Sequence, residues 1–579
     1  MVPVSTSALP PKLSTPSSSR RWGIGDALLL SAVLLFGYGL FWFAYEWFAV
    51  KTDVVEIDLS PLALPQYTFF SMSRGLLAYV FSLLFTLVYG YWAAKDRVAG
   101  KLLVPLLDVL QSIPVLGFMP GLVLALKGAF PSGNMGLELA AVLMIFTGQA
   151  WNMTFSYYHS LRAVPDDIKE AATLYRFNWR QRLRWVELPY SAIGLVWNSM
   201  MSMAGGWFFL MINEAFKLGE HSFRLPGLGS YMSEAVDQGN IPAMIWAVVA
   251  MVTMIVALDQ FLWRPVVVWS QKFRMEDAGL VENASSWFLD WVRKLRTVEW
   301  LSQQWNRKSS QEQPSRPRNV TTTPEAEVPH WALPLSRVSL AILIGVMLWG
   351  AWELVHLLKD VPWENWLEII LSAGWTLLRV LTAIVLGTLW TLPLGLAIGL
   401  SPKWSRIFQP IVQVAASFPA PMLFPAAIAA LAWFGVSLNW GSVLLMLLGT
   451  QWYILFNVIA GAMAIPADLK EAARCYRFGA WQRFRVLYLP AAFSSLVTGW
   501  VTAAGGAWNA SIVTEYVIYN KKTLEASGLG AQISKAAEHE DFPLLAAGVI
   551  VMAVIVVVFN RTVWKRLYRL AEERYSLNR

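Results

Sequence analysis

Long apolar stretches recur along the whole chain and alternate with short polar segments. A bilayer core of about 30 Å needs about 20 helical residues, so each stretch is long enough to cross a membrane. About twelve are present, at 27–50, 69–94, 102–126, 137–158, 191–216 and 241–269, and then at 333–358, 369–400, 407–434, 443–464, 491–518 and 542–559. The pattern predicts an all-α polytopic membrane protein.

Charged residues are distributed unevenly over the segments between these stretches. One set of loops and both ends of the chain carry cations: Arg20, Arg21, Lys95, Arg97, Lys101, Lys403, Arg406, Arg561, Lys565, Arg566 and Arg569. Two loops of the opposite set are acidic, with Asp53, Glu56 and Asp58 in one and Asp360, Glu364 and Glu368 in the other. Because positively charged loops tend to stay in the cytoplasm, we predict that both termini are cytoplasmic.

The composition supports this class and excludes others. The chain of 579 residues is 56% hydrophobic and 15% charged, outside the usual range of soluble proteins. Its net charge of +8 follows from the loop asymmetry, so we expect no nucleic-acid partner. The single Cys475 excludes an internal disulfide, and five scattered histidines predict no metal site.

Three segments lie outside the apolar pattern. Residues 1–26 are rich in Ser, Pro and Thr and should form a disordered cytoplasmic tail; the apolar stretch that follows is too long for the core of a cleavable signal. Residues 271–331 read as a cytoplasmic linker and residues 565–579 as a basic cytoplasmic tail. Within the linker, apolar residues fall at helical spacing: Phe288, Trp291, Val292, Leu295, Val298 and Trp305. This predicts an amphipathic helix on the cytoplasmic lipid surface or, alternatively, one that docks on a partner.

The chain contains an internal duplication. The segment PDDIKEAATLYRF at Pro165 recurs as PADLKEAARCYRF at Pro466, an offset of 301 residues that holds downstream. Upstream the offset is 305, and a loop between Pro120 and Pro165 should absorb the difference. We therefore predict two parallel six-helix repeats, at 27–270 and 332–564, around a central pathway. The alternative is a duplication in which one half has become only structural.

The duplicated segment lies between the fourth and fifth spans of each half, and we expect it to form two short helices. Pro165 favours a helix start, and Asn178, or Gly479 in the second copy, supplies a turn residue. Small residues form one face and would let another protein approach closely, with Glu170 or Glu471 at the rim. A hairpin that is merely solvated is the plainer interpretation, but it does not explain why two distant copies are nearly identical.

At these residues the sequence resembles the permease subunits of ABC importers, whose cytoplasmic loop has Glu-Ala-Ala, a glycine, and then Leu-Pro. The matching positions are Glu170, Ala171, Ala172, Leu188 and Pro189, and in the second half Glu471, Ala472, Ala473, Leu489 and Pro490. ELPYSAIGLVWNSMMSMAGGW and YLPAAFSSLVTGWVTAAGGAW, each followed by Gly-Leu-Gly, resemble the nitrate, sulfonate and taurine group and its duplicated permeases. Arg176 and Arg477 stand where that family has its glycine, so we expect the turn to move to Asn178 and Gly479.

The resemblance implies a type I importer fold and a set of partners. Two ATPase subunits or domains would bind ATP and Mg²⁺ and move the two hairpins, and a substrate-binding protein would dock on the extracytoplasmic face. The chain has no phosphate-binding Gly-rich loop, so we expect neither a cofactor nor catalysis in it. The implied location is the inner membrane of a bacterial cell, and the implied cargo is a small anion such as nitrate, a sulfonate or bicarbonate.

Several residues inside the spans are candidates for the pathway. Arg74 and Arg379 occupy equivalent places in the second spans, and Glu214 and Glu515 lie near the outer ends of the fifth. Because a buried arginine needs a partner, these residues form either structural ion pairs or a ring that attracts anions. Pro114 and Pro419, two positions after Ser112 and Ser417, should interrupt the third spans. Trp207 and Trp508 are either gates or packing residues.

Two other classes of protein remain open. Twelve spans in two parallel halves would also suit a secondary transporter driven by an ion gradient, although the paired hairpins favour the ABC class. A membrane-embedded enzyme would need clustered His, Cys or carboxylate residues, and the sequence has none.

Overall fold

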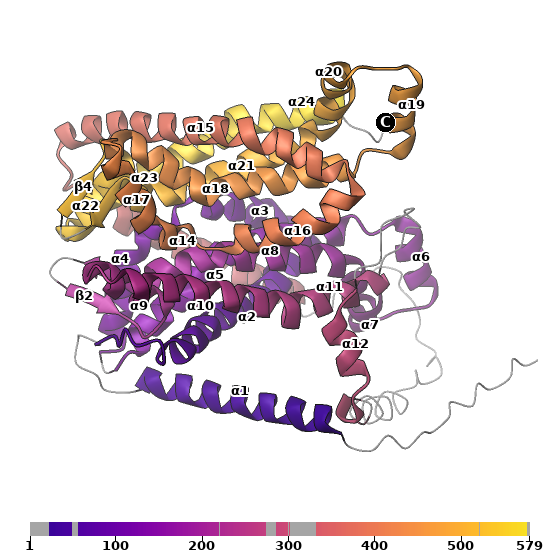
Figure 1. Ribbon diagram of the computed structural model, residues 1–579, viewed down its shortest axis with the longest axis horizontal. Coiled ribbons are helices and arrows are strands. Elements are labelled where there is room, and N and C mark those ends of the chain that lie inside the picture. The colour runs from indigo at the N-terminus through magenta and orange to yellow at the C-terminus, as the bar shows by residue number, and fades with distance from the viewer. Residues whose placement is uncertain are drawn as a thin grey trace, which may run out of the picture. The chain divides into compact units, whose positions relative to one another are not determined.

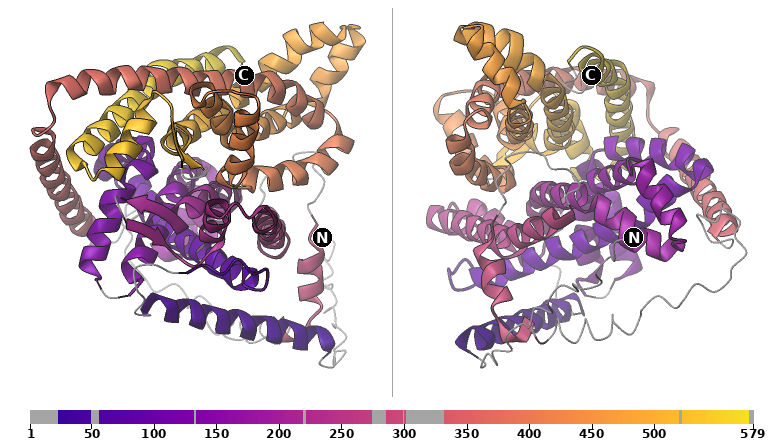
Figure 2. Two further views of the ribbon diagram at one scale, coloured as in Figure 1. Left: turned by 60° about the vertical axis from the view of Figure 1, so that its left-hand side comes forward. Right: turned by 90° about the vertical axis from the view of Figure 1, so that its right-hand side faces the viewer.

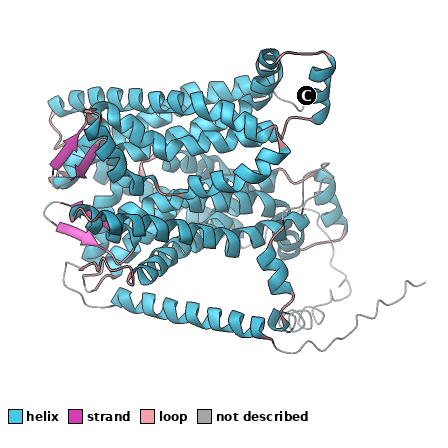
Figure 3. Cartoon of the chain, in the orientation of Figure 1, coloured by secondary structure: helices cyan, strands magenta, loops and turns pink. Residues whose placement is uncertain are grey.

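Long helices dominate the computed structural model of the chain (Figure 3). It describes residues 23–48, 56–131, 133–218, 221–273, 285–298, 300, 332–519 and 522–575. The first half contains α1 (Ile24–Phe48), α2 (Leu64–Lys95), α3 (Arg97–Ser112), α4 (Val115–Ala129), α5 (Met135–Arg162), α6 (Asp166–Leu174), α7 (Trp179–Arg182), η1 (Leu183–Glu187), α8 (Leu188–Glu214), β1 (Ala215–Leu218), β2 (His221–Arg224), α9 (Leu228–Asp237), α10 (Ile241–Leu258), η2 (Asp259–Trp263), α11 (Arg264–Ser270) and η3 (Gln271–Phe273).

The second half repeats this order after α12 (Trp287–Arg293). It contains α14 (Ala332–Leu358), α15 (Trp363–Gly399), α16 (Pro402–Ser417), η4 (Ala420–Leu423), α17 (Phe424–Trp433), α18 (Leu438–Met463), α19 (Ala467–Cys475), α20 (Ala480–Arg483), η5 (Phe484–Tyr488), α21 (Leu489–Thr514), β3 (Tyr516–Tyr519), β4 (Lys522–Glu525), α22 (Leu529–Glu538), α23 (Phe542–Phe559), η6 (Asn560–Trp564) and α24 (Lys565–Tyr575). Strands and helices from β1 to η2 recur 301 residues later, and α3 recurs 305 residues later, as the sequence predicts. The offset changes in the loop between α4 and α5.

The polytopic helical class is confirmed. Among the described residues, nine helices are long and apolar enough to cross a membrane, and two bent pairs raise this number to eleven. The predicted count of about twelve also includes α5, which has 28 residues but carries Glu138 and Gln149. The short antiparallel hairpins β1–β2 and β3–β4 were not predicted.

The third span of each half is broken, as the prolines predict. α3 and α4 meet at an angle of 94°, and α16 meets the following segment at 84°. Pro114 and Pro419 stand directly before the second helical segment, where the missing N–H of proline costs no hydrogen bond. The break frees the Val115 N–H, which donates to Oδ1 of Asn509 on α21, in the other half, at 2.7 Å.

Within each half, three long helices pack closely side by side: α2, α5 and α8, and α15, α18 and α21. Glycines stand at the crossings. A Cβ on Gly148 would lie 2.4 Å from the Phe209 ring, and a Cβ on Gly395 would lie 2.7 Å from Val458. Small residues at such crossings let helices approach when no hydrophobic effect drives them together in lipid.

The two kinds of connection lie at opposite ends of these long helices. Figure 1 shows α6, α7, α19 and α20 at one end and the β-hairpins with α9 and α22 at the other. Figure 2 turns the same ribbon by 60° and by 90° about the vertical axis. Equivalent parts of both repeats therefore face the same side of the membrane, as parallel repeats require.

Contacts divide the chain into two units, residues 1–41 with 285–322, and residues 42–284 with 323–579. In the smaller unit, the Asp26 carboxylate accepts hydrogen bonds from the Thr297 N–H and hydroxyl at 2.9 and 2.6 Å. The amphipathic helix predicted over 288–305 is wrong as one continuous helix, because α12 ends at Arg293. Trp305 and most of the linker lie outside the described residues. The repeat boundaries, the tails and the surface on which this segment lies stay predictions.

Candidate functional site

A buried arginine joins three helices in the first half. The guanidinium of Arg74 on α2 binds both oxygens of Glu138 on α5 at 2.6 Å and Oε1 of Glu214, at the end of α8, at 2.7 Å. It also donates to the Pro226 carbonyl at 2.7 Å. All three charged side chains are at most 1% exposed. At the β-hairpin end of the helices, this network ties α2, α5 and α8 to the loop before α9.

The second half has the same network with one change. Arg379 binds Oε1 of Glu515 at 2.8 Å and the Ser527 carbonyl at 2.9 Å. Asn439 stands where the first half has Glu138, 301 residues earlier, and accepts from Arg379 through its backbone and side-chain oxygens, both at 3.0 Å. The second network therefore contains one carboxylate, not two.

The Gly-Leu-Gly segment belongs to this network. Oε2 of Glu214 accepts from the Gly229 N–H at 2.7 Å, and Oε2 of Glu515 accepts from the Gly530 N–H at 2.8 Å. A Cβ on Gly227 would lie 2.4 Å from the Glu214 carboxylate, so no larger residue fits. Each carboxylate thus caps the N-terminus of α9 or α22, where the helix dipole stabilises negative charge.

The structural ion pairs proposed from the sequence are present. Sequence reasoning missed Glu138 and Asn439. The available signals were a carboxylate inside an otherwise apolar stretch and its partner at the repeat offset. Because Glu138 lies in the first turn of α5, the dipole of that helix offsets part of the additional negative charge.

At the opposite end, each predicted hairpin forms as two short helices. The first, α6, ends in a Schellman motif: the Phe177 N–H binds the Ala172 carbonyl and the Arg176 N–H binds the Thr173 carbonyl, both at 2.9 Å. In the second half Phe478 and Arg477 make the equivalent bonds, at 3.1 and 2.9 Å.

The expected shift of the turn to Asn178 and Gly479 is wrong. The chain reverses at Arg176 and Arg477, whose φ angles of 53° and 52° lie in the left-handed region that favours glycine. Asn178 has an extended backbone and caps α7, accepting from the Gln181 N–H at 2.9 Å. The hairpin therefore keeps its turn at the position of the family's glycine. The backbone there is strained, because an arginine adopts a positive φ.

Only part of the alanine face of each hairpin is exposed for contact with another protein. Ala172 and Ala473 are buried inside their hairpins, whereas Ala472 is exposed and Ala171 half-buried. Glu170 and Glu471 are exposed. Leu188 and Leu489 begin α8 and α21, with Pro189 and Pro490 in the first turn after the single π-turns η1 and η5. A continuous helical connection thus runs from each hairpin into the fifth span.

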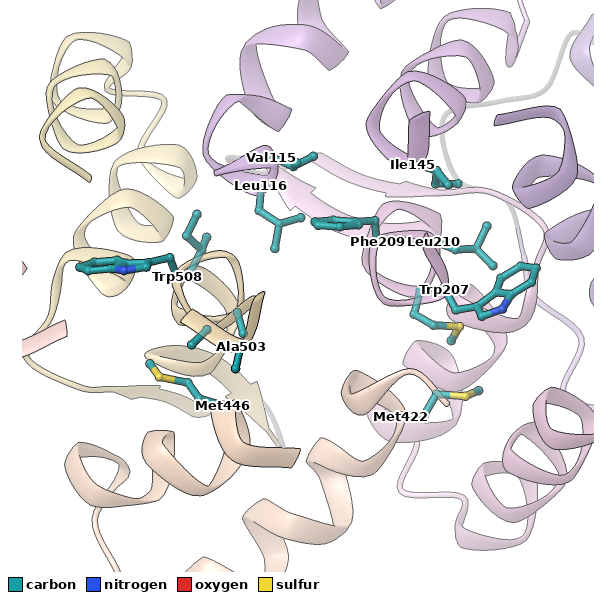
Figure 4. Packing of buried hydrophobic residues seen from close by; sticks show 14 of the residues in the cluster. Val115, Leu116, Ile145, Trp207, Phe209, Leu210, Met422, Met446, Ala503 and Trp508 are labelled. Carbon is teal, nitrogen blue, oxygen red and sulfur yellow. The ribbon is translucent and has the colours of Figure 1, made fainter. Parts of the chain in front are cut away.

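The other candidates meet across the two halves. Trp207 and Ser417 line a cavity of about 20 Å³, and Trp508 and Ser112 line one of about 40 Å³. Both indoles are 3% exposed and lie within the apolar core (Figure 4). Their packing role is visible, because a Cβ on Gly75 would lie 2.6 Å from the Trp207 ring. A gating role for either tryptophan stays a prediction.

A larger cavity of about 360 Å³ lies between the halves at the end of the β-hairpins. α4, α9 and β1 line it from the first half, and η4, α17, β3 and α22 from the second. Arg74 and Arg379 do not line it, and neither do their carboxylate partners. Among the described residues, no group of His, Cys, Asp or Glu is placed to hold a metal ion.

Two repeats of membrane-spanning helices, with a helical hairpin at one end and a capped short helix at the other, are the architecture expected of a transport permease. A family model described as the binding-protein-dependent transport system inner membrane component matches residues 86–262 and 391–576. The chain belongs to this family, and it is a multi-pass permease subunit of the ABC importer type, duplicated in one polypeptide.

Named relatives each match part of the chain. The taurine transport system permease protein TauC of Escherichia coli is 26% identical over 247 residues, 39% of this chain and 86% of that protein. The aliphatic sulfonates transport permease protein SsuC of the same organism, whose assignment is provisional, is 28% identical over 237 residues, 39% of this chain and 84% of that protein. The bicarbonate transport system permease protein CmpB of Synechococcus elongatus is 26% identical over 149 residues, 25% of this chain and 50% of that protein.

The unequal charge of the two arginine networks predicts unequal costs of removing the arginine. Arg74→Met leaves two buried carboxylates without a cation and should destabilise the protein by ~3–5 kcal/mol. Arg379→Met leaves only one buried carboxylate without a cation, so the unfolding temperature of this variant should fall less. Thermal unfolding of the purified protein measures both, and adding Glu138→Gln and Glu214→Gln to Arg74→Met should restore most of the loss. Equal losses for the two arginine variants would contradict this account.

The left-handed arginine predicts a stabilising substitution. Arg176→Gly removes the strain of a side chain at positive φ, worth ~1 kcal/mol, and should slow hydrogen exchange of the Phe177 amide roughly fivefold. Arg180→Gly, on the helical backbone of α7, is the matched control and should speed exchange in the same hairpin. The prediction fails if both substitutions change protection in the same direction.

Proposed function

We propose that the chain forms the transmembrane pathway of an importer for a small solute with an acidic group, of the sulfonate, nitrate or bicarbonate kind. Two separate ATPase subunits or domains drive it through the hairpins α6–α7 and α19–α20. The observation that carries this proposal is that two nearly identical hairpins present exposed Glu170 and Glu471 at the same end of the helices (Figure 1). The acidic group is inferred from the substrates for which the relatives are named.

The local structure of the first hairpin suits the transmission of force. Val164, Ala172 and Val186 form a small buried cluster inside it. Arg182 on α7 donates to the Thr173 hydroxyl on α6 at 2.9 Å, and the Tyr190 hydroxyl donates to the Ala163 carbonyl at 2.9 Å. A packed hairpin that is continuous with a long helix moves as one body, so a partner that shifts it also tilts α8.

The proposal includes the partners that membership of this family implies. ATP and Mg²⁺ are bound by the ATPase, since this chain has no phosphate-binding loop. The hairpin end faces the cytoplasm together with both termini, and a substrate-binding protein docks at the end that carries α9 and α22. The host membrane is the inner membrane of a bacterium. The chain itself catalyses no reaction and works by alternating between two arrangements of its halves.

In this proposal Arg74 and Arg379 are positioning residues. Four nitrogen–oxygen hydrogen bonds already engage the Arg74 guanidinium, and four engage that of Arg379. A passing anion would have to displace these bonds inside a buried site. The arginines therefore hold the helices that line the pathway and do not form an anion-attracting ring.

Loss of the exposed glutamates should uncouple transport from ATP hydrolysis. Glu170→Ala combined with Glu471→Ala removes a rim contact from each hairpin, and roughly fivefold less ATP-driven uptake is expected for ~1 kcal/mol of lost coupling. Uptake into membrane vesicles and ATP hydrolysis by the co-purified complex are measured together. Glu573→Ala, at an exposed position of α24, is the control and should leave both unchanged.

Unaltered uptake in the double variant would overturn the coupling role of the hairpins. Uptake that a protonophore abolishes and that ATP depletion leaves intact would instead establish the gradient-driven class.

A further inference from the structure

The cavity of about 360 Å³ between the two halves, which we name the outer cavity, has a size typical of ligand sites. It lies at the end of the helices that carries the β-hairpins and α9 and α22 (Figure 1). Its lining is mainly apolar, with six large side chains from both halves: Met119, Met211, Phe216, Met232, Met422 and Phe424. Flexible methionine side chains and aromatic rings adapt to the apolar body of an organic molecule.

The charged side chains of the lining carry a net negative charge. They are one cation, Arg224, and two carboxylates, Asp237 and Glu538. Arg224 is already bound on two sides, by Asp237 at 2.8 Å and by Glu234. Among the described lining residues, no other cation is present to receive an anion.

The two carboxylates occupy equivalent places in the repeats. Asp237 is the last residue of α9, and Glu538, 301 positions later, is the last residue of α22. A helix C-terminus carries a partial negative charge, so both ends add to the negative potential of the cavity. Two halves of the chain thus direct negative charge into one space.

An aromatic side chain beside one of these carboxylates also favours a cationic ligand. The Tyr516 hydroxyl on β3 donates to Oε2 of Glu538, and its ring lines the cavity. Burial and the neighbouring Glu538 raise the pKa of Tyr516 to about 12, so the phenol remains a neutral donor at physiological pH. Aromatic faces beside carboxylates attract an alkylated ammonium group.

Arg224, the cation of the cavity lining, has a structural role, as the equivalent positions of the second half indicate. Arg224 pairs with Glu234 in the first half, and Glu525 pairs with Lys535 at the equivalent positions in the second. The two charges of the ion pair have exchanged places, but the ion pair itself is present in both halves. Both halves therefore retain the link between the β-hairpin and the following helix. A solute that needs Arg224 would have to break that link.

We propose that the outer cavity takes an organic solute that has an apolar body and no net negative charge, in the first place a zwitterion with an ammonium and an acidic group. The ammonium lies toward Glu538, whose partner in the structure is the neutral Tyr516 hydroxyl, and the apolar body lies among the methionines and phenylalanines. A free inorganic anion such as nitrate or bicarbonate would lose its hydration without gaining a cation. This inference rests on the proposed transport function and narrows its substrate class.

Binding to the full chain in nanodiscs tests the proposal without any ATPase. Three probes are compared by equilibrium dialysis, with empty nanodiscs as the blank: 3-(benzyldimethylammonio)propanesulfonate, benzenesulfonate and bicarbonate. The zwitterion should bind at least tenfold more tightly than benzenesulfonate, which has a similar ring but a net negative charge, and bicarbonate should not displace it. Displacement by bicarbonate, or equal affinity of the two sulfonates, would overturn the proposal.

Substitutions locate the binding in the outer cavity. Met119→Trp fills part of the space and should weaken zwitterion binding at least tenfold, whereas Leu124→Trp, on the exposed face of the same helix, should not. Glu538→Gln keeps the shape of the site; it should weaken zwitterion binding and strengthen benzenesulfonate binding. If neither the filling nor the charge variant changes the affinity, the proposed site is wrong. The coupling experiment on Glu170 and Glu471 is unaffected by either result.

Discussion

The buried guanidinium groups of Arg74 and Arg379 are the constraint on which the β-hairpin end of the structure depends. A charge inside a membrane protein is tolerated only when partners surround it, so each arginine draws several helices and a loop to one point. The carboxylate that neutralises the arginine also caps α9 or α22 through the glycine N–H. One interaction therefore satisfies the buried charge and places the helices that line the outer cavity.

The two halves keep the positions of their interactions while changing the chemistry. Glu138 becomes Asn439, and the pair formed by Arg224 and Glu234 returns with its signs reversed. At the hairpin end, Lys95 binds Glu187 at 2.5 Å, whereas the residue equivalent to Glu187 is Tyr488. Only the reversed pair keeps its charge balance, whereas the second half lacks the carboxylates of Glu138 and Glu187. These changes make the halves chemically distinct, so a solute or partner meets two different surfaces.

The hairpins show how a backbone conformation outlasts the residue that suits it best. Arginine replaces glycine in both copies, yet the chain still reverses at that position in the left-handed conformation. The hydrogen bonds of the Schellman motif and the buried alanine outweigh the ~1 kcal/mol of strain. The prediction that the turn moves to Asn178 and Gly479 was wrong. It rested on the residue type alone and ignored the carbonyl groups at the end of the helix, which need hydrogen-bond donors.

The sequence by itself determined the membrane class, the duplication, the broken third spans and the paired hairpins. These features follow from the length of the apolar stretches, from the repeated sequence segments and from the positions of proline. All of these are local properties of the chain. Only the tertiary structure showed that Glu138 shares Arg74 with Glu214, that Asn509 binds the broken helix of the other half, and that Asp237 and Glu538 face one cavity. These contacts join residues far apart in the chain, and their partners are chosen by helix packing, which no local pattern encodes.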